Sequence, residues 1–270
     1  MSVELLSPAA AAVAGLGEHA LTCDLYDEHG GPIYHDITGA DDSELREVLT
    51  LLRDITPAGA ILELAAGAGR MTLPILASGR AVTALDSSDT LLGILRGRLG
   101  ELVPAAAARA HLVTADMANF RFPGRYAAIA LGSTTITLLP PDRRPALYRC
   151  VRTHLQPDGC FIVTVPLPAQ SGAHLASVHR VATGLSGTRY DMYDEVQEGT
   201  AYRTVTVIPH QPPGSPARPV PVATSRPGLF DGRVIGDELR CAGFVLVHEI
   251  TLSGLTERLD AGLQVWAVAR

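Results

Sequence analysis

The chain has 270 residues, 47% of them hydrophobic, which is enough to bury one α/β core with or without an insertion. Its net charge of −6 disfavours a nucleic-acid partner, because such binding depends on neutralising phosphates. The sequence contains no lysine, which excludes Schiff-base enzymes and P-loop nucleotide hydrolases.

The sequence predicts neither a signal peptide nor a membrane span. The first four residues carry no basic group, and no apolar run approaches the roughly 18 residues of a membrane helix. The cysteines are scattered, without a CxxC pair or a histidine at metal-ligand spacing, and are Cys23, Cys150, Cys160 and Cys241. We therefore expect buried free thiols, a cytoplasmic location and no metal site.

From residue 41 to 165 the predicted elements alternate between helices and strands. They are a helix from Asp41, a strand at 60–65, a helix at 69–78, a strand at 81–86, a helix at 89–99 capped by Ser88, strands at 111–116 and 126–131, a helix at 141–155 and a strand at 160–165. Strands that alternate with helices build a parallel, doubly wound sheet.

This alternation stops after residue 166. We expect a helix at 171–183, an antiparallel hairpin of 189–196 and 202–208, and a proline-rich segment over 209–221 that is loop or extended. A helix at 233–242 and strands at 244–250 and 263–269 then complete the core. The short connection between the last two strands makes them antiparallel to each other.

The turn after the first core strand reads Glu63-Leu64-Ala65-Ala66-Gly67-Ala68-Gly69, and the second strand ends at Asp86. Glycines let backbone amides approach a ligand, and a carboxylate can accept both hydroxyls of a ribose. The pattern therefore predicts a nucleoside site. A dinucleotide site would need a small residue at Thr72 and no acid at Glu63, because the acid repels a pyrophosphate and attracts a cation.

These residues resemble the cofactor site of the class I S-adenosylmethionine (SAM) methyltransferases. The resemblance covers about 45–165 and 233–270. It implies SAM as cofactor and a Rossmann-like seven-stranded α/β sheet whose last strand is antiparallel. It also implies that Asp86 binds the ribose, that Asp116 and Met117 hold the adenine, and that Tyr26 and Tyr34 cover the cofactor. The implied cofactor contacts are Glu63, Ala65, Gly67, Gly69, Asp86, Ser87, Asp116, Met117, Gly132, Tyr26 and Tyr34.

The implied domain organisation is a lid at 1–40, a SAM-binding core at 41–165, a substrate-cover insertion at 166–232 and completion of the core at 233–270, in a single domain overall. Strand 126–131 ends in Gly132-Ser133-Thr134, at the edge of the sheet where ligands bind. The hydroxyls of Ser133 and Thr134 could orient a nucleophile or cap the next helix, and the sequence leaves both open.

Transfer to a neutral amine needs alignment more than acid–base help, whereas an oxygen acceptor would more often need a base. The base candidates are His35, Asp36, His174 and His179. Asp191 and Asp194 alternate with tyrosines, so one face of the hairpin could line an acidic, aromatic pocket for an amine. A solvated edge strand would show the same pattern.

Residues 23–27, 32–36 and 62–67 resemble the methyltransferases of daptide-type ribosomal peptide (RiPP) clusters. Those enzymes methylate the modified amino terminus of a peptide, so the resemblance implies N-methylation of a small molecule or short peptide in natural product biosynthesis. The alternatives are O- or C-methylation of a small molecule, a non-catalytic SAM-binding scaffold, and a nicotinamide-dependent oxidoreductase. A homodimer is compatible with the sequence.

Overall fold

The computed structural model describes residues 6–167, 177–197, 199–211, 219–256 and 259–269. The chain divides into two compact units. The N-terminal unit comprises residues 1–40 and 173–229, and the core unit comprises residues 41–172 and 230–270. The N-terminal unit therefore combines the first forty residues with most of the segment predicted as an insertion.

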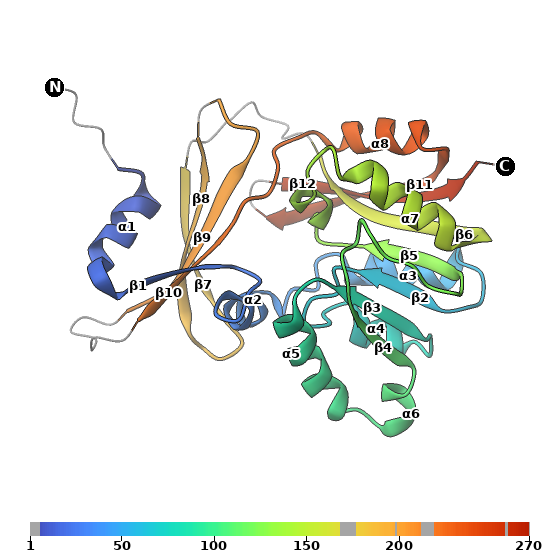
Figure 1. Cartoon of the computed structure of the whole chain (residues 1–270), viewed down its shortest axis with the longest axis horizontal. Helices are drawn as coiled ribbons and strands as arrows, with labels where there is room; N and C mark the ends of the chain where they lie inside the picture. The colour runs from blue at the N-terminus through green and yellow to red at the C-terminus, as the bar shows by residue number, and fades with distance from the viewer. Residues whose placement is uncertain (1–5, 168–176, 198, 212–218, 257–258, 270) are drawn as a thin grey trace. The chain divides into compact units, whose positions relative to one another are not determined.

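The core unit is built on a seven-stranded sheet in the order β11-β12-β6-β5-β2-β3-β4 (Figure 1). Its parallel strands are β2 (Ile61–Leu64), β3 (Val82–Asp86), β4 (Ala110–Thr114), β5 (Tyr126–Leu131) and β6 (Leu155–Pro166). The last strand, β12 (Leu259–Val268), runs antiparallel to both β6 and β11 (Phe244–Thr256). The predicted Rossmann-like α/β fold with a reversed last strand is confirmed.

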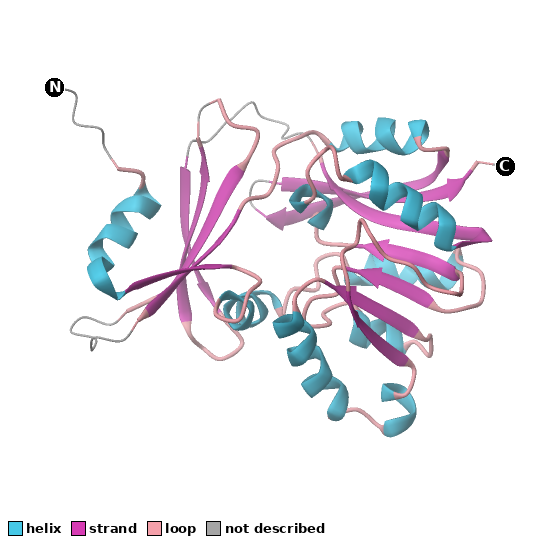
Figure 2. Cartoon of the chain, viewed as in Figure 1, coloured by secondary structure: helices cyan, strands magenta, loops and turns pink. Residues whose placement is uncertain are grey.

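Helices cover both faces of this sheet (Figure 2). One face packs against α3 (Leu45–Asp54), α4 (Thr72–Ala77) and α5 (Asp89–Gly100), and the other against α7 (Arg144–His154) and α8 (Gly232–Cys241). Ile61 faces the first set and Leu62 the second, so neighbouring strand residues are both buried. Burial on both faces explains why the parallel strands read as continuous apolar runs. Shorter helical elements are α6 (Pro104–Ala107) and η2 (Thr135–Leu138).

The N-terminal unit contains a five-stranded sheet in the order β1-β10-β9-β8-β7. The strands are β1 (Ala20–Asp24), β7 (Ser177–Thr183), β8 (Arg189–Val196), β9 (Arg203–Pro209) and β10 (Val220–Ser225). Only the β1–β10 pair is parallel. Helix α1 (Pro8–Leu16) packs on one face of the sheet and α2 (Gly30–Thr38) on the other, with η1 (Gly17–His19) after α1.

One expectation for this unit is wrong. Residues 177–183 form strand β7 rather than a helix, because their backbone pairs with β8 along the whole strand; residues 171–176 lie outside the described residues. Strand β10 begins at the end of the segment predicted as loop or extended, and it lies between β1 and β9. The predicted hairpin is confirmed as β8 and β9.

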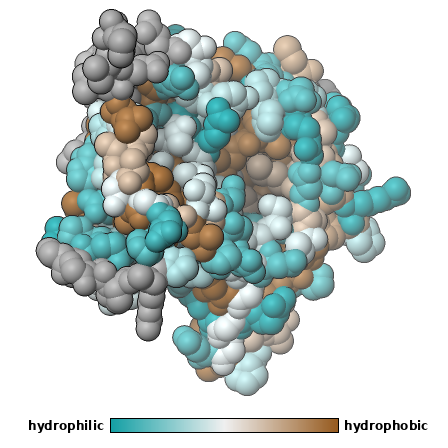
Figure 3. Space-filling view, turned by 60° about the vertical axis from the view of Figure 1, so that its left-hand side comes forward, coloured by the Kyte–Doolittle hydropathy of each residue, from teal (hydrophilic) through white to brown (hydrophobic). Residues whose placement is uncertain are grey.

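Several large apolar side chains of the described residues are exposed, among them Leu6, Val103, Leu185 and Val247. On the face drawn in Figure 3, apolar and hydrophilic residues are interspersed. The four cysteines are free, but only Cys160 is buried and Cys241 is exposed, so the expectation of buried thiols holds for one of them. Within the described ranges, no helix is long and apolar enough to cross a membrane.

Candidate active site

Asp86 ends β3 beside the glycine turn that follows β2. Its Oδ2 accepts the backbone N–H of Gly67 at 2.7 Å, and its Oδ1 accepts that of Ser88 at 2.8 Å. Burial raises the pKa of the Asp86 carboxyl, and these backbone N–H groups oppose the shift. Each carboxylate oxygen carries a second lone pair, so the group can shape the turn and still accept ribose hydroxyls.

The backbone of the turn is left-handed at three positions. Ala65, Gly67 and Gly69 have φ of 52°, 55° and 82°. A Cβ on Gly69 would lie 2.2 Å from Cδ1 of Leu95, so only glycine fits there. Turns of this kind present backbone N–H groups to a ligand, and a strained non-glycine residue such as Ala65 is typical of functional sites.

Glu63 is fully buried at the start of the same turn. Thr72 Oγ1 donates a hydrogen bond to Glu63 Oε2 at 2.5 Å. Burial raises the pKa of Glu63 to about 8, although the Thr72 hydrogen bond acts in the opposite direction. Glu63 and Thr72 are the two residues that depart from a dinucleotide fingerprint, and the structure shows that they are hydrogen-bonded to each other.

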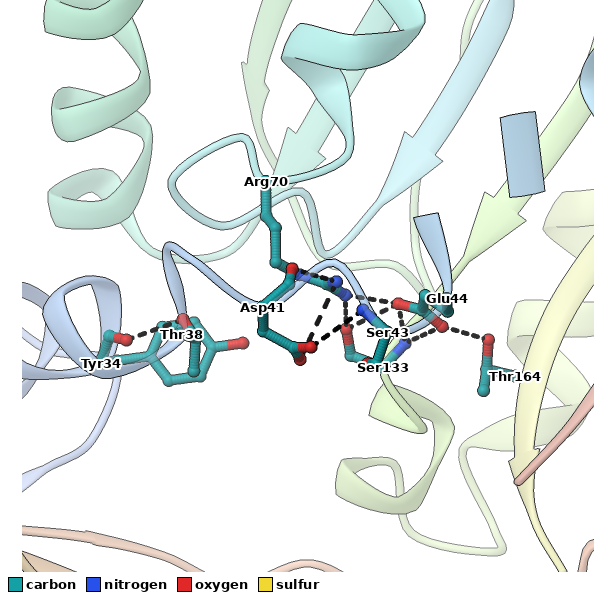
Figure 4. A network of polar contacts seen from close by, with 8 residues as sticks. All are labelled: Tyr34, Thr38, Asp41, Ser43, Glu44, Arg70, Ser133 and Thr164. Atoms are coloured by element: carbon teal, nitrogen blue, oxygen red, sulfur yellow. Dashed lines mark hydrogen bonds and ion pairs between the residues drawn. The ribbon is translucent and has the colours of Figure 1, made fainter. Parts of the chain in front are cut away.

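Beyond β5 the chain again turns left-handed, at Ser133 and Thr134, with φ of 56° and 53°. The Ser133 hydroxyl donates to Glu44 Oε1 at 2.9 Å and accepts from Arg70 (Figure 4). Thr134 precedes η2 but makes no side-chain cap, so the capping alternative is wrong for this residue. Sequence reasoning missed Glu44, because an acid before a helix is ordinarily a solvated capping residue.

Asp116 and Met117, predicted to hold the adenine, follow β4. The Asp116 carboxylate pairs with Arg143 and accepts the backbone N–H of Ala118 at 2.8 Å. Met117 is half-buried against the face covered by α7 and α8, and Ser87 is exposed. Their contacts with a cofactor stay predictions.

The other predicted residues lie in the N-terminal unit. Tyr26 and Tyr34 pack edge to face, with ring centroids 5.2 Å apart. Asp36 of α2, next to His35, accepts hydrogen bonds at 2.7 Å from the Ser186 backbone, the Ser186 hydroxyl and Tyr190 Oη. Burial would raise the pKa of Asp36, but these hydrogen bonds hold it below the ordinary value and make the carboxylate a weak base.

The hairpin acids are both hydrogen-bonded to basic side chains. Asp191 accepts from His179 Nε2 at 2.8 Å and from His210 Nδ1 at 3.0 Å, and Asp194 pairs with Arg203. The aromatic residues of β8 also divide between the two faces, because Tyr190 packs towards α2 and Tyr193 towards α1. Asp191 and Asp194 therefore lie on opposite faces of β8, and an acidic, aromatic pocket on one face stays a prediction. The edge-strand alternative is wrong, because β8 lies between β7 and β9. His174 lies outside the described residues.

Asp191→Asn tests the role of the two hydrogen bonds between Asp191 and the histidines. Burial raises the pKa of Asp191, but hydrogen bonds from His210 and His179 outweigh it and lower the pKa below 3.8. The carboxylate therefore contributes stability above that pH, which is lost as the pH falls through the lowered pKa. We expect the variant to melt about 2–6 °C lower at pH 7, with the difference closing towards pH 3.

The control for Asp191→Asn is Glu18→Gln, which removes an exposed carboxylate from the same unit. Calorimetry at pH 7 and pH 3 gives the comparison. Equal melting temperatures of Asp191→Asn and the unmodified protein at pH 7 would show that these two hydrogen bonds contribute nothing.

Comparisons with known proteins identify the family. Residues 61–159 match the model of a methyltransferase domain. The crystal structure of the glycopeptide N-methyltransferase MtfA complexed with SAM is 30% identical, with a TM-score of 0.67, over 98% of this chain and 99% of that chain. Comparison with curated protein sequences gives no significant match.

Two further structures share the fold. The CcbJ methyltransferase from Streptomyces caelestis is 19% identical over 84% of this chain and 90% of that chain, with a TM-score of 0.71. DesVI from Streptomyces venezuelae is 22% identical over 85% and 93%, with a TM-score of 0.65. The chain belongs to the class I SAM-dependent methyltransferases. It is an enzyme, and SAM is its cofactor.

The residues of the core unit fit this cofactor. The carboxyl edge of the sheet carries the left-handed glycine turn, the Asp86 carboxylate with its spare lone pairs, and the buried acid Glu63. SAM supplies an electrophilic methyl group on a cationic sulfonium. The protein contributes binding and alignment for an in-line displacement.

Proposed function

We propose that this enzyme transfers the methyl group of SAM to an amine nitrogen of a peptide natural product. The observation that carries the proposal is the extent of the similarity to the glycopeptide N-methyltransferase, which spans 98% of this chain. The family model matches only 61–159, in the core unit. The SAM-binding core is common to the whole family and does not identify the acceptor. The similarity to the glycopeptide N-methyltransferase extends beyond that core into the N-terminal unit, and this additional similarity supports a similar acceptor.

The chemistry of the described residues supports nitrogen over oxygen. A neutral amine attacks a sulfonium with its own lone pair, whereas a hydroxyl would more often need a base. Of the base candidates, Asp36 has a lowered pKa and three hydrogen-bond donors, and His179 is paired with Asp191. The Ser133 hydroxyl donates a hydrogen bond to Glu44, so its hydrogen is already engaged.

A narrower acceptor follows from the resemblance to daptide-type methyltransferases. Two of the segments that carry it, 23–27 and 32–36, fall in β1, α2 and the turn that joins them. These elements belong to the N-terminal unit. The proposal therefore includes the modified amino terminus of a ribosomally made peptide as the specific acceptor.

The test is to incubate the enzyme and SAM with a short peptide that has a free N-terminal amine, and with the same peptide N-acetylated. We expect monomethyl and then dimethyl products on the free peptide and none on the acetylated one, because an N-methylated amine remains a nucleophile. At limiting peptide the rate should rise with pH towards the amine pKa, about 7.7–8.0 for an α-amino group.

Tandem mass spectrometry locates the transferred methyl. A single methyl on oxygen or carbon, with the acetylated peptide equally active, would replace the amine assignment by O- or C-methylation. That result would leave the family assignment intact.

A further inference from the structure

Glu44 is a buried carboxylate whose position sequence reasoning did not explain. It immediately precedes α3, but its side chain makes no cap to that helix. Instead it points into the core unit and is 1% exposed. Burying a carboxylate is costly unless several donors satisfy it, so its partners indicate what it does.

The partners of Glu44 come from three different loops and strands. Oε1 accepts the Ser133 backbone N–H at 2.8 Å and the Ser133 hydroxyl at 2.9 Å, and Oε2 accepts Thr164 Oγ1 of β6 at 2.6 Å. Arg70 of the glycine turn forms an ion pair with Oε1 and also donates to the Asp41 carbonyl at 3.0 Å (Figure 4). We call Glu44, Arg70, Ser133 and Thr164 the Glu44 cluster.

The loop that Glu44 holds is strained. Ser133 and Thr134 both have left-handed φ, which is strained for a non-glycine residue and persists only where the surrounding contacts compensate it. The preceding residue is Gly132, where a Cβ would lie 2.7 Å from Glu44 Oε1 and 2.6 Å from Met71 Cε, so a larger residue there would displace both side chains. The carboxylate is thus packed against the backbone whose conformation it fixes.

We propose that Glu44 is a positioning residue of the SAM site: its carboxylate fixes the left-handed loop after β5 and ties it to the glycine turn through Arg70. Both loops lie at the carboxyl ends of parallel strands, the edge where ligands bind in open α/β sheets. Small displacements there are costly to binding and alignment. The inference concerns SAM binding and does not depend on the acceptor.

The experiment is a double-mutant cycle on SAM affinity, with Glu44→Ala, Ser133→Gly and both together, each titrated with SAM by calorimetry. Glycine adopts a φ near +56° without strain, so the loop needs Glu44 less when residue 133 is glycine. We expect Glu44→Ala to weaken SAM binding at least tenfold, but less than threefold in the Ser133→Gly background. A role in folding alone would leave the SAM affinity of the folded variants unchanged in both backgrounds, and equal losses would mean that Glu44 does not act through the Ser133 loop.

Glu47→Ala is the matched control, because it removes a half-buried acid from the first turn of the same helix and should leave SAM affinity unchanged. If Glu44→Ala does not fold, Glu44→Gln replaces it in the cycle, since glutamine keeps the volume and one acceptor oxygen. Equal losses in the two backgrounds, unchanged affinity, or tighter SAM binding in the Glu44 variants would overturn the proposal.

Discussion

Replacing Asp86 by alanine is expected to weaken SAM binding at least tenfold and also to lower the melting temperature of the free protein. Two hydrogen bonds from ribose hydroxyls to a carboxylate are worth about 1.5–3 kcal/mol each, and about 1.4 kcal/mol is a factor of ten in affinity. The melting temperature falls because alanine removes the carboxylate oxygens that accept the backbone N–H groups of Gly67 and Ser88.

Two further variants separate these effects. Asp86→Asn keeps one acceptor oxygen and should preserve more of the melting temperature than Asp86→Ala, while SAM affinity still falls. Asp89→Ala removes an exposed carboxylate three residues away, whose partner is the Thr114 hydroxyl at 2.6 Å. It should not change SAM affinity. Calorimetric titration gives the affinities, and unchanged SAM binding in Asp86→Ala would refute the assignment of the ribose site.

The second large effect is a pH dependence of stability caused by Glu63. Its pKa is raised from 4.5 to about 8 in the folded protein. The stability that it contributes is therefore fully present below pH 4.5 and is lost as the pH rises through 8, by up to about 1.4 kcal/mol per pH unit. Glu63→Gln should remove this slope, so the variant should be the more stable protein above pH 8.

Urea unfolding at pH 5 and pH 8.5 measures the difference, with Glu101→Gln at the exposed end of α5 as a control that keeps the slope. A cation near a carboxyl lowers its pKa. SAM binding at pH 7 should therefore release protons from the unmodified enzyme, and fewer from Glu63→Gln, when titrated in buffers of different ionisation enthalpy. Parallel pH profiles of Glu63→Gln and the unmodified protein would contradict the raised pKa.

The sequence pattern predicts correctly those helices and strands whose formation depends on residues close together in the chain. The apolar run Tyr126–Leu131 is β5 residue for residue, and Ser88 caps α5 by accepting the Leu91 N–H at 3.2 Å. The sequence predicts the helix after the first core strand from residue 69, but α4 begins at Thr72, because Gly69 is left-handed and residues 70 and 71 continue the turn.

The local sequence pattern does not predict which distant strands pair with each other. Strand β1 pairs with β10 about two hundred residues later, and nothing in the periodicity of either segment identifies its partner. The same limit applies to the site. The glycine turn and Asp86 are adjacent elements with a recognisable spacing, whereas Glu44 joins residues from three separate segments and resembles an ordinary helix-start acid.

The most direct test of this account is a crystal structure of the enzyme with S-adenosylhomocysteine, the demethylated product of SAM. Both ribose hydroxyls should lie within hydrogen-bond distance of the Asp86 carboxylate. The amino-acid end of the ligand should lie over the Gly67–Gly69 turn, between Glu63 and the Glu44 cluster. A ligand bound elsewhere, or a ribose that does not contact Asp86, would contradict it.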